Sequence, residues 1–148
     1  MGPCVKFVQG CLGTEMCKWW AQDSLGLTEA IHEKMKDRIF PAKVKIGISG
    51  CQRCCSESQV RDIGINGTTK GWMVFFGGNV GTKPRIGNLI AWGLSESEAI
   101  DCADRLLSYY GSYANPKERT ARFVERIGMN RIKTELLVLL PYIPVDNI

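Results

Sequence analysis

Two pairs of cysteines, each at a bend that contains glycine, restrict most strongly how this chain can fold. Five residues separate Cys11 from Cys17, and three residues separate Cys51 from Cys55. A glycine stands directly before the first cysteine of each pair, so the backbone can turn tightly there. Four thiolates from two separate loops can enclose either a zinc ion or an iron–sulfur cluster. The fold must therefore bring two distant loops to one place.

Length and composition indicate one globular unit. The chain has 148 residues, of which 45% are hydrophobic and 23% charged, enough to bury a core. We expect a single domain over residues 1–148, with residues 127–148 as a helical C-terminal tail. No apolar run reaches the length of a membrane span, and the first residues lack the apolar stretch of a signal peptide. The odd count of seven cysteines favours metal-bound thiolates in a reducing cytoplasm over disulfides.

The charge pattern gives little support to binding of nucleic acid. The net charge is only +4, and the basic residues are scattered along the chain. Nucleic-acid sites usually combine a basic stripe with interleaved aromatic residues. The pair Trp19-Trp20 beside Lys18 has this character, but we interpret it as core packing at the start of a helix. We therefore expect neither a nucleic-acid partner nor a membrane partner.

Hydrophobic periodicity predicts both strands and helices. The alternation of Val44, Ile46 and Ile48 predicts a half-buried strand that leads straight into the second cysteine pair. Strands are predicted over Val5–Gln9, Lys43–Ser49, Ile63–Ile65 and Trp72–Phe76, with a turn at Asn66-Gly67. Helices are predicted over Thr14–Asp23, from an N-cap at Thr28 to before Pro41, over Arg53–Val60, from a capping box at Ser95 and Glu98 to about Tyr110, from Asn115 to Gly128, and over Asn130–Leu140. The expected fold class is α+β, with α/β character: a mixed sheet of four to five strands flanked by helices.

The cysteine spacing favours a cluster over zinc. Structural zinc sites usually space their paired ligands by two to four residues and often include histidine. The chain has one histidine, His32, which we expect at the surface or boundary of a helix away from both loops. A Rieske centre needs two histidines and is therefore excluded. A cubane 4Fe–4S cluster is the favoured interpretation, and a zinc site stays as the alternative.

The residues around the cysteines resemble the two cluster motifs of the sirohaem-dependent nitrite and sulfite reductases. The matching segments are CLGTEMCK at 11–18, IGISGCQRCCSE at 46–57, QVRDIG at 59–64 and FGGN at 76–79. The resemblance extends over residues 5–126, with all motifs in order, and it implies the fold of the 4Fe–4S domain of that family.

The resemblance also implies cofactors and their ligands. In that family four cysteines hold a 4Fe–4S cluster, and the last of them also ligates the iron of sirohaem. By position, the implied cluster ligands are Cys11, Cys17, Cys51 and Cys55, with Cys55 as the bridge. The residues implied to contact the carboxylates of sirohaem, through cations or backbone donors, are Arg53, Asn79, Lys83 and Arg85. The alternative for Lys83 and Arg85 is a solvated loop, and the alternative for Asn79 is an ordinary hairpin turn.

Two positions depart from the family pattern. Gln52 stands where a proline commonly follows the first cysteine of the second motif, and Cys54 directly precedes the last cysteine. The family spacing favours Cys55 as the ligand, so we expect Cys54 to pack beside the cluster loop. Cys4 and Cys102 are expected to be structural, because buried free cysteines behave as small hydrophobic residues.

The resemblance implies an oxidoreductase that reduces a small oxyanion, sulfite or nitrite, with several electrons. No catalytic side chain is identified. The expected partners are an electron-donor protein or a flavin or ferredoxin-type domain, together with a further domain, a partner subunit or a second copy that completes the site. Two alternatives remain open: an iron–sulfur electron-transfer module without sirohaem, and a structural zinc domain that mediates interactions.

Overall fold

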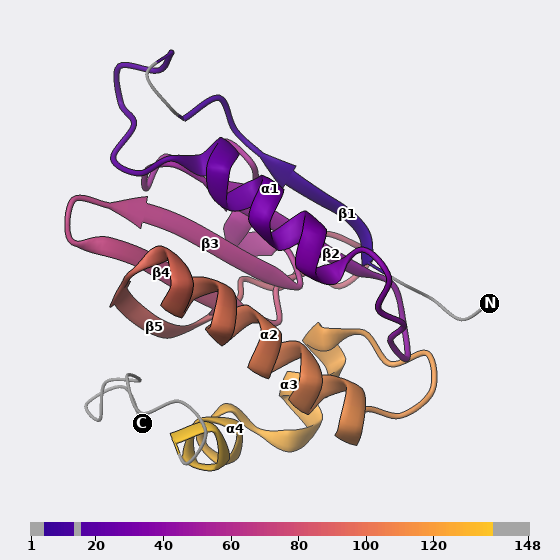
Figure 1. Ribbon diagram of the computed structural model, residues 1–148. Helices are drawn as coiled ribbons and strands as arrows, with labels where there is room; N and C mark the ends of the chain where they lie inside the picture. Colours follow the sequence, from indigo (N-terminus) through magenta and orange to yellow (C-terminus); the bar gives the residue numbers. More distant parts are fainter. Residues whose placement is uncertain (1–4, 14–15, 138–148) are drawn as a thin grey trace.

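A five-stranded mixed sheet forms the centre of the computed structural model, which describes residues 5–13 and 16–137 (Figure 1). The strands lie in chain order across the sheet. They are β1 (Val5–Gly10), β2 (Val44–Ser49), β3 (Ile63–Thr68), β4 (Gly71–Phe76) and β5 (Asn88–Leu94). β1, β2 and β3 are parallel, whereas β4 and β5 are antiparallel to their neighbours. The predicted fold class is confirmed.

Helices cover one face of this sheet. α1 (Ser24–Met35) and α2 (Glu96–Tyr113) lie side by side over it (Figure 1). The alternating apolar residues of β2 meet the apolar stripe of α1 in the core. These fully buried residues are Val44, Ile46 and Ile48 on β2 and Leu27, Ile31 and Met35 on α1. α3 (Thr120–Ile127) packs at the end of the sheet where β4 terminates, and α4 (Met129–Leu137) follows it in the chain.

The two connections between the parallel strands leave the sheet on opposite faces. α1 joins β1 to β2 on the helical face, and residues 50–62, with the 3-10 turn η1 (Ser58–Val60), join β2 to β3 on the other. This second connection lies directly on the strands, because a Cβ on Gly64 would stand 1.8 Å from the Ser58 carbonyl oxygen. Such a switch opens a crevice at the carboxyl ends of the strands, where open sheets bind ligands. Both cysteine loops begin there.

Several sequence predictions are confirmed. Ser95 and Glu98 form the capping box of α2, the helix α3 ends at Gly128, and the stripe of α1 is buried. The predicted tail helix is present as α4, and its continuation to Leu140 lies outside the described residues. Within the described ranges, none of the helices is both long and apolar enough to cross a membrane.

Four predicted helices differ from the structure. Residues 16–23 form turns instead of a helix, because the amides of Ala21 and Gln22 bond across to the Gly50 carbonyl oxygen. The helix predicted over 53–60 is reduced to η1, since Cys54 and Glu57 have positive φ angles. α1 begins at Ser24 with Asp23 as its N-cap, so the hydroxyl of the predicted cap Thr28 instead bonds inside the helix. α3 begins at Thr120, later than predicted from Asn115.

Two strand predictions were also incomplete. Asn66 and Gly67 lie inside β3, and the turn of the hairpin falls at Thr69 and Lys70. Gly67 serves close packing there, because a Cβ would lie 2.6 Å from the Gly50 carbonyl oxygen. The strand β5 was missed, since irregular pairing with β4 and a positive φ at Gly93 interrupt its alternation.

Candidate cluster site

The four predicted cluster ligands line one pocket of about 390 Å³ at the carboxyl ends of β1 and β2. Cys11 follows β1 and Cys51 follows β2, while Cys17 and Cys55 complete the lining from the same two loops. Within residues 5–13 and 16–137, no three His, Cys, Asp or Glu side chains lie close enough to share a single metal ion. A 4Fe–4S cluster takes one cysteine on each iron, so its ligands surround a larger body. The pocket fits such a cluster better than one zinc ion.

Direct backbone contact holds the two cysteine loops together. A Cβ on Gly13 would lie 3.0 Å from the Gly50 Cα atom, so both loops need glycine at their crossing. The amides of Ala21 and Gln22 donate to the Gly50 carbonyl oxygen at 2.9 and 3.0 Å. The sequence places glycines at these bends, and they allow the loops to converge.

Backbone amides also point at two of the cysteine sulfurs. The amides of Gly13 and Gly50 each donate to Cys11 Sγ at 3.2 Å, and the Arg53 amide donates to Cys51 Sγ at 3.5 Å. Hydrogen bonds to ligand sulfurs orient the ligands and help to set the reduction potential of an iron–sulfur cluster. The chain therefore supplies both the thiols and the donors that such a cluster needs.

An aromatic and cationic pair lies at the mouth of the pocket. The Arg53 guanidinium carbon lies 4.0 Å from the centre of the Trp19 ring, and this contact joins the two loops. Lys18 Nζ lies 4.9 Å from the same ring centre. Trp19 and Trp20 are 51% and 43% exposed and both line the pocket. The prediction that they pack in the core was wrong, because no helix forms at residues 16–23. Their position inside a cysteine loop was the signal that could have placed them here.

Cys54 does not line the pocket, although it neighbours Cys55. Its Sγ atom lies 3.2 Å from Ser58 Oγ and accepts a hydrogen bond from the Gln59 amide at 3.4 Å. Cys54 therefore faces the sheet while Cys55 faces the pocket. This arrangement agrees with the interpretation of Cys54 as a packing thiol beside the loop.

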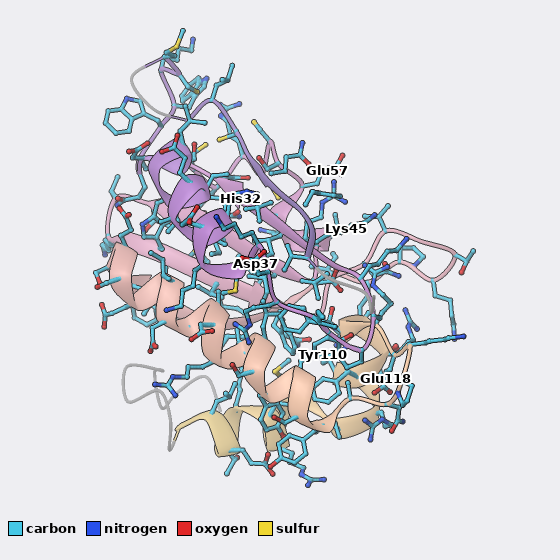
Figure 2. All side chains as sticks on the ribbon, turned by 45° about the vertical axis from the view of Figure 1, so that its right-hand side comes forward. His32, Asp37, Lys45, Glu57, Tyr110 and Glu118 are labelled. Carbon is cyan, nitrogen blue, oxygen red and sulfur yellow. The ribbon has the colours of Figure 1, made fainter. Side chains whose placement is uncertain are left out.

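The other cysteines and the histidine lie away from the pocket. Cys102 is fully buried on α2, and burial raises the pKa of its thiol well above the usual range. His32 is exposed on α1, as predicted (Figure 2). Cys4 lies outside the described residues.

Residues 1–141 match the family model described as the nitrite and sulphite reductase 4Fe-4S domain. The chain belongs to this family. The family predicted from the cysteine motifs is thus confirmed, and with it the cofactor class expected of such a domain, a 4Fe–4S cluster with sirohaem.

Relatives of this reductase domain include two curated enzymes. The assimilatory-type sulfite reductase of Nitratidesulfovibrio vulgaris is 45% identical over 134 residues, which are 90% of this chain and 62% of that protein. The NAD(P)H nitrite reductase of Bacillus subtilis is 36% identical over 135 residues, which are 91% of this chain and 17% of that protein. The chain therefore spans less than two thirds of these relatives.

A solved structure shares the fold of this domain. The structure of the Mycobacterium tuberculosis NirA protein superposes with a TM-score of 0.78 at 20% identity, covering 97% of this chain and 28% of that one. At this identity the likeness shows the fold alone. It agrees with the mixed sheet and its helical cover.

The residues expected to bind sirohaem lie in two separate places. Arg53 lines the pocket, whereas Asn79, Lys83 and Arg85 belong to the loop between β4 and β5 and do not line it. This loop begins after Phe76, which pairs with the first residue of β3, at the sheet end opposite the cysteines.

Bonds within the β4–β5 loop account for its shape. Asn79 and Arg85 exchange backbone hydrogen bonds of 2.8 and 2.9 Å, and the Arg85 guanidinium donates to the Gly77 carbonyl at 3.2 Å. The Asn79 side-chain amide donates to the carbonyl of Lys83, whose side chain is exposed. A contact of these residues with sirohaem stays a prediction.

Proposed function

We propose that this reductase domain holds a 4Fe–4S cluster on Cys11, Cys17, Cys51 and Cys55, and that Cys55 also ligates the iron of sirohaem. Bound there, the two cofactors would pass electrons from an external donor to a small oxyanion, sulfite or nitrite. The observation that carries this proposal is the convergence of four cysteines from two loops on one pocket, from which Cys54 turns away.

The chain's own residues support a second group beside the cluster. Cys55 is the exposed member of the four, so its sulfur has an open side toward a further ligand. Arg53 lies exposed beside it and carries the charge that carboxylates of a tetrapyrrole require. Asn79, Lys83 and Arg85 stay predicted contacts of sirohaem, although their loop begins at the sheet end opposite Cys55.

The domain would act within a larger assembly. It covers 62% and 17% of its two enzyme relatives, and we propose that other chain segments or subunits supply the remaining substrate contacts. Leu12 and Met16 at the cysteine loop are 67% and 83% exposed, which supports a covering partner. An electron-donor protein or a flavin or ferredoxin-type domain would deliver electrons, and we expect the cytoplasm as the location.

Analysis of the full chain purified without oxygen tests the proposal. We expect about four acid-labile sulfides and about five irons per chain, because the iron of sirohaem adds to those of the cluster, together with the strong visible bands of sirohaem. A broad brown absorbance without those bands would instead support an electron-transfer module. Zinc without iron or sulfide would overturn the assignment.

A matched pair of neighbouring variants tests the ligand set. Cys55→Ser should abolish the coupling between haem and cluster and reduce the iron content, because it removes a proposed shared ligand. Cys54→Ser should retain both cofactors, because that side chain faces the sheet. Equal losses in the two variants, or a loss only in Cys54→Ser, would reject Cys55 as the bridge.

A further inference from the structure

The second cysteine loop rests on a buried polar network instead of an apolar core. Ser49, Ser58 and Asn66, from β2, η1 and β3, are all at most 1% exposed. The Ser58 hydroxyl lies 3.2 Å from Ser49 Oγ and donates to the Asn66 side-chain oxygen, and the Ser49 hydroxyl accepts from the Ser56 amide at 3.2 Å. Buried hydroxyls are unfavourable unless they are hydrogen-bonded, so these groups depend on one another.

Asn66 in this network carries an energetically unfavourable buried group. Its Nδ2 atom is buried without a hydrogen-bond partner among the described residues. An unsatisfied buried donor costs free energy that an apolar residue would avoid. Since the Asn66 oxygen accepts from Ser58, the side chain serves to hold Ser58 in place.

Cys54 connects the loop to this network. Its thiol contacts Ser58 Oγ at 3.2 Å and accepts from the Gln59 amide at 3.4 Å. Its φ angle is +62°, in the left-handed region that a residue with a Cβ atom rarely adopts. Glu57, three residues later, is also left-handed, with a φ angle of +52°. Such backbone strain persists only where surrounding contacts enforce it.

The strained turn separates two adjacent thiols. Cys55 lines the pocket, while Cys54 faces the strands through Ser58. We propose that Cys54 is a positioning residue for Cys55, because its thiol fastens the second cysteine loop to the sheet through Ser58. The role given to Cys55 rests on the proposed function. The contact of Cys54 with Ser58, which we call the anchor, is a property of the chain alone.

Substitutions at Cys54 test the anchor through the cluster. Serine keeps a group that can bond to Ser58 and alanine removes it, while both keep a Cβ and hence the same backbone strain. With a chelator present, Cys54→Ala and Ser58→Ala should lose iron about fivefold faster than the parent, as expected for one lost hydrogen bond. The rate of iron loss from Cys54→Ser should stay within about twofold of that of the parent. The electron paramagnetic resonance signal of the reduced cluster should broaden in Cys54→Ala and recover in Cys54→Ser.

Cys102→Ala is the matched control, since it also removes a free thiol but on α2, away from the loop. Its rate of iron loss should equal that of the parent. The proposal is overturned if Cys54→Ala holds iron and gives the parent signal, or if Cys102→Ala loses iron equally fast.

Alkylation of the full chain without its cluster tests the anchor independently of the cofactor. With iodoacetamide and peptide mass spectrometry, Cys55 should react well before Cys54. Ser58→Ala should raise the rate at Cys54 about fivefold and leave Cys102 protected. Equal rates at Cys54 and Cys55 in the parent would refute the anchor. If purified protein lacks iron, the proposed function fails, but the alkylation rates still show whether the anchor exists. The same holds if Cys54→Ala does not fold, because this measurement does not use that variant.

Discussion

The two ends of the sheet are built by different means. At the end where β4 terminates, large aromatic side chains fill the space between the sheet, α2 and α3. Phe76, Tyr110 and Phe123 are fully buried, and the Phe123 ring meets Tyr110 edge-on at 5.4 Å and Phe76 at 6.4 Å. Figure 2 shows Tyr110 and Glu118 at this end. We call it the aromatic end.

The cysteine end has little of this packing. Its loops meet through Gly13 and Gly50, through amide bonds to a carbonyl and through amide bonds to sulfur. Leu12 and Met16 on the first loop are exposed. Apolar burial thus stabilises the fold at one end, while backbone fit shapes the site at the other. Substitutions should therefore separate stability from cluster binding.

Phe123→Ala should give the largest loss of stability. Removing a buried aromatic ring at the aromatic end should lower the free energy of unfolding by about 4 kcal/mol. Phe123 does not line the pocket between the cysteine loops. Urea denaturation measures the loss, and iron per folded chain should match the parent. A fall in iron per folded chain that parallels the loss of stability would show that the two ends are coupled.

Gly64→Ala should affect both stability and the site. The added Cβ would stand 1.8 Å from the Ser58 carbonyl oxygen, so the connection beneath the second cysteine loop must move off the sheet. We expect a loss of about 3 kcal/mol in the free energy of unfolding and a loss of iron beyond that of Phe123→Ala. Denaturation and iron analysis of the same preparations measure the two effects.

Gly111→Ala provides the control for this glycine. In α2 the nearest atom to an added Cβ is Phe40 Cδ1 at 3.8 Å, an ordinary contact. Alanine should there stabilise the helix by up to about 1 kcal/mol, with unchanged iron. If Gly64→Ala behaves in the same way, backbone fit does not shape the cysteine end.

Local patterns predicted the elements that local interactions decide. The alternation in β2, the stripe of α1 and the capping box of α2 depend on neighbouring residues, and all three are present. Cys54 contacts Ser58 beneath the loop and Cys55 lines the pocket, which agrees with the expectation from the motif.

Long-range contacts account for what the sequence did not reveal. Residues 16–23 have helical character in isolation, but their amides bond to Gly50, which is distant in sequence. Trp19 and Trp20 are therefore displaced to the pocket mouth. The order of the motifs associated the loop of Asn79, Lys83 and Arg85 with the cysteines. Because β4 runs antiparallel to β3 and ends beside the first residue of β3, this loop begins at the other end of the sheet.

The smallest expected effect concerns pH at the aromatic end. The Arg126 guanidinium donates to both carboxylate oxygens of Glu118 at 2.8 and 2.9 Å and holds the pKa of that carboxyl below its ordinary value of 4.5. A carboxyl with a lowered pKa in the folded state stabilises the fold above its unfolded pKa, and this contribution disappears as the pH falls through the folded value. Arg126→Met should therefore be slightly less stable at neutral pH, and its difference from the parent should shrink as the pH falls below 4.5 and through the lowered pKa of Glu118.

Urea unfolding of both chains from pH 7 down to pH 3, followed through the helical signal, measures this difference. Arg105→Met, which removes an exposed ion pair with Asp101 on α2, is the control and should show a weaker dependence. At neutral pH the iron content of Arg126→Met should equal that of the parent, since the contact lies at the aromatic end. A difference between Arg126→Met and the parent that persists unchanged to pH 3 would mean that Arg126 acts through packing instead of charge, because protonated Glu118 no longer attracts it.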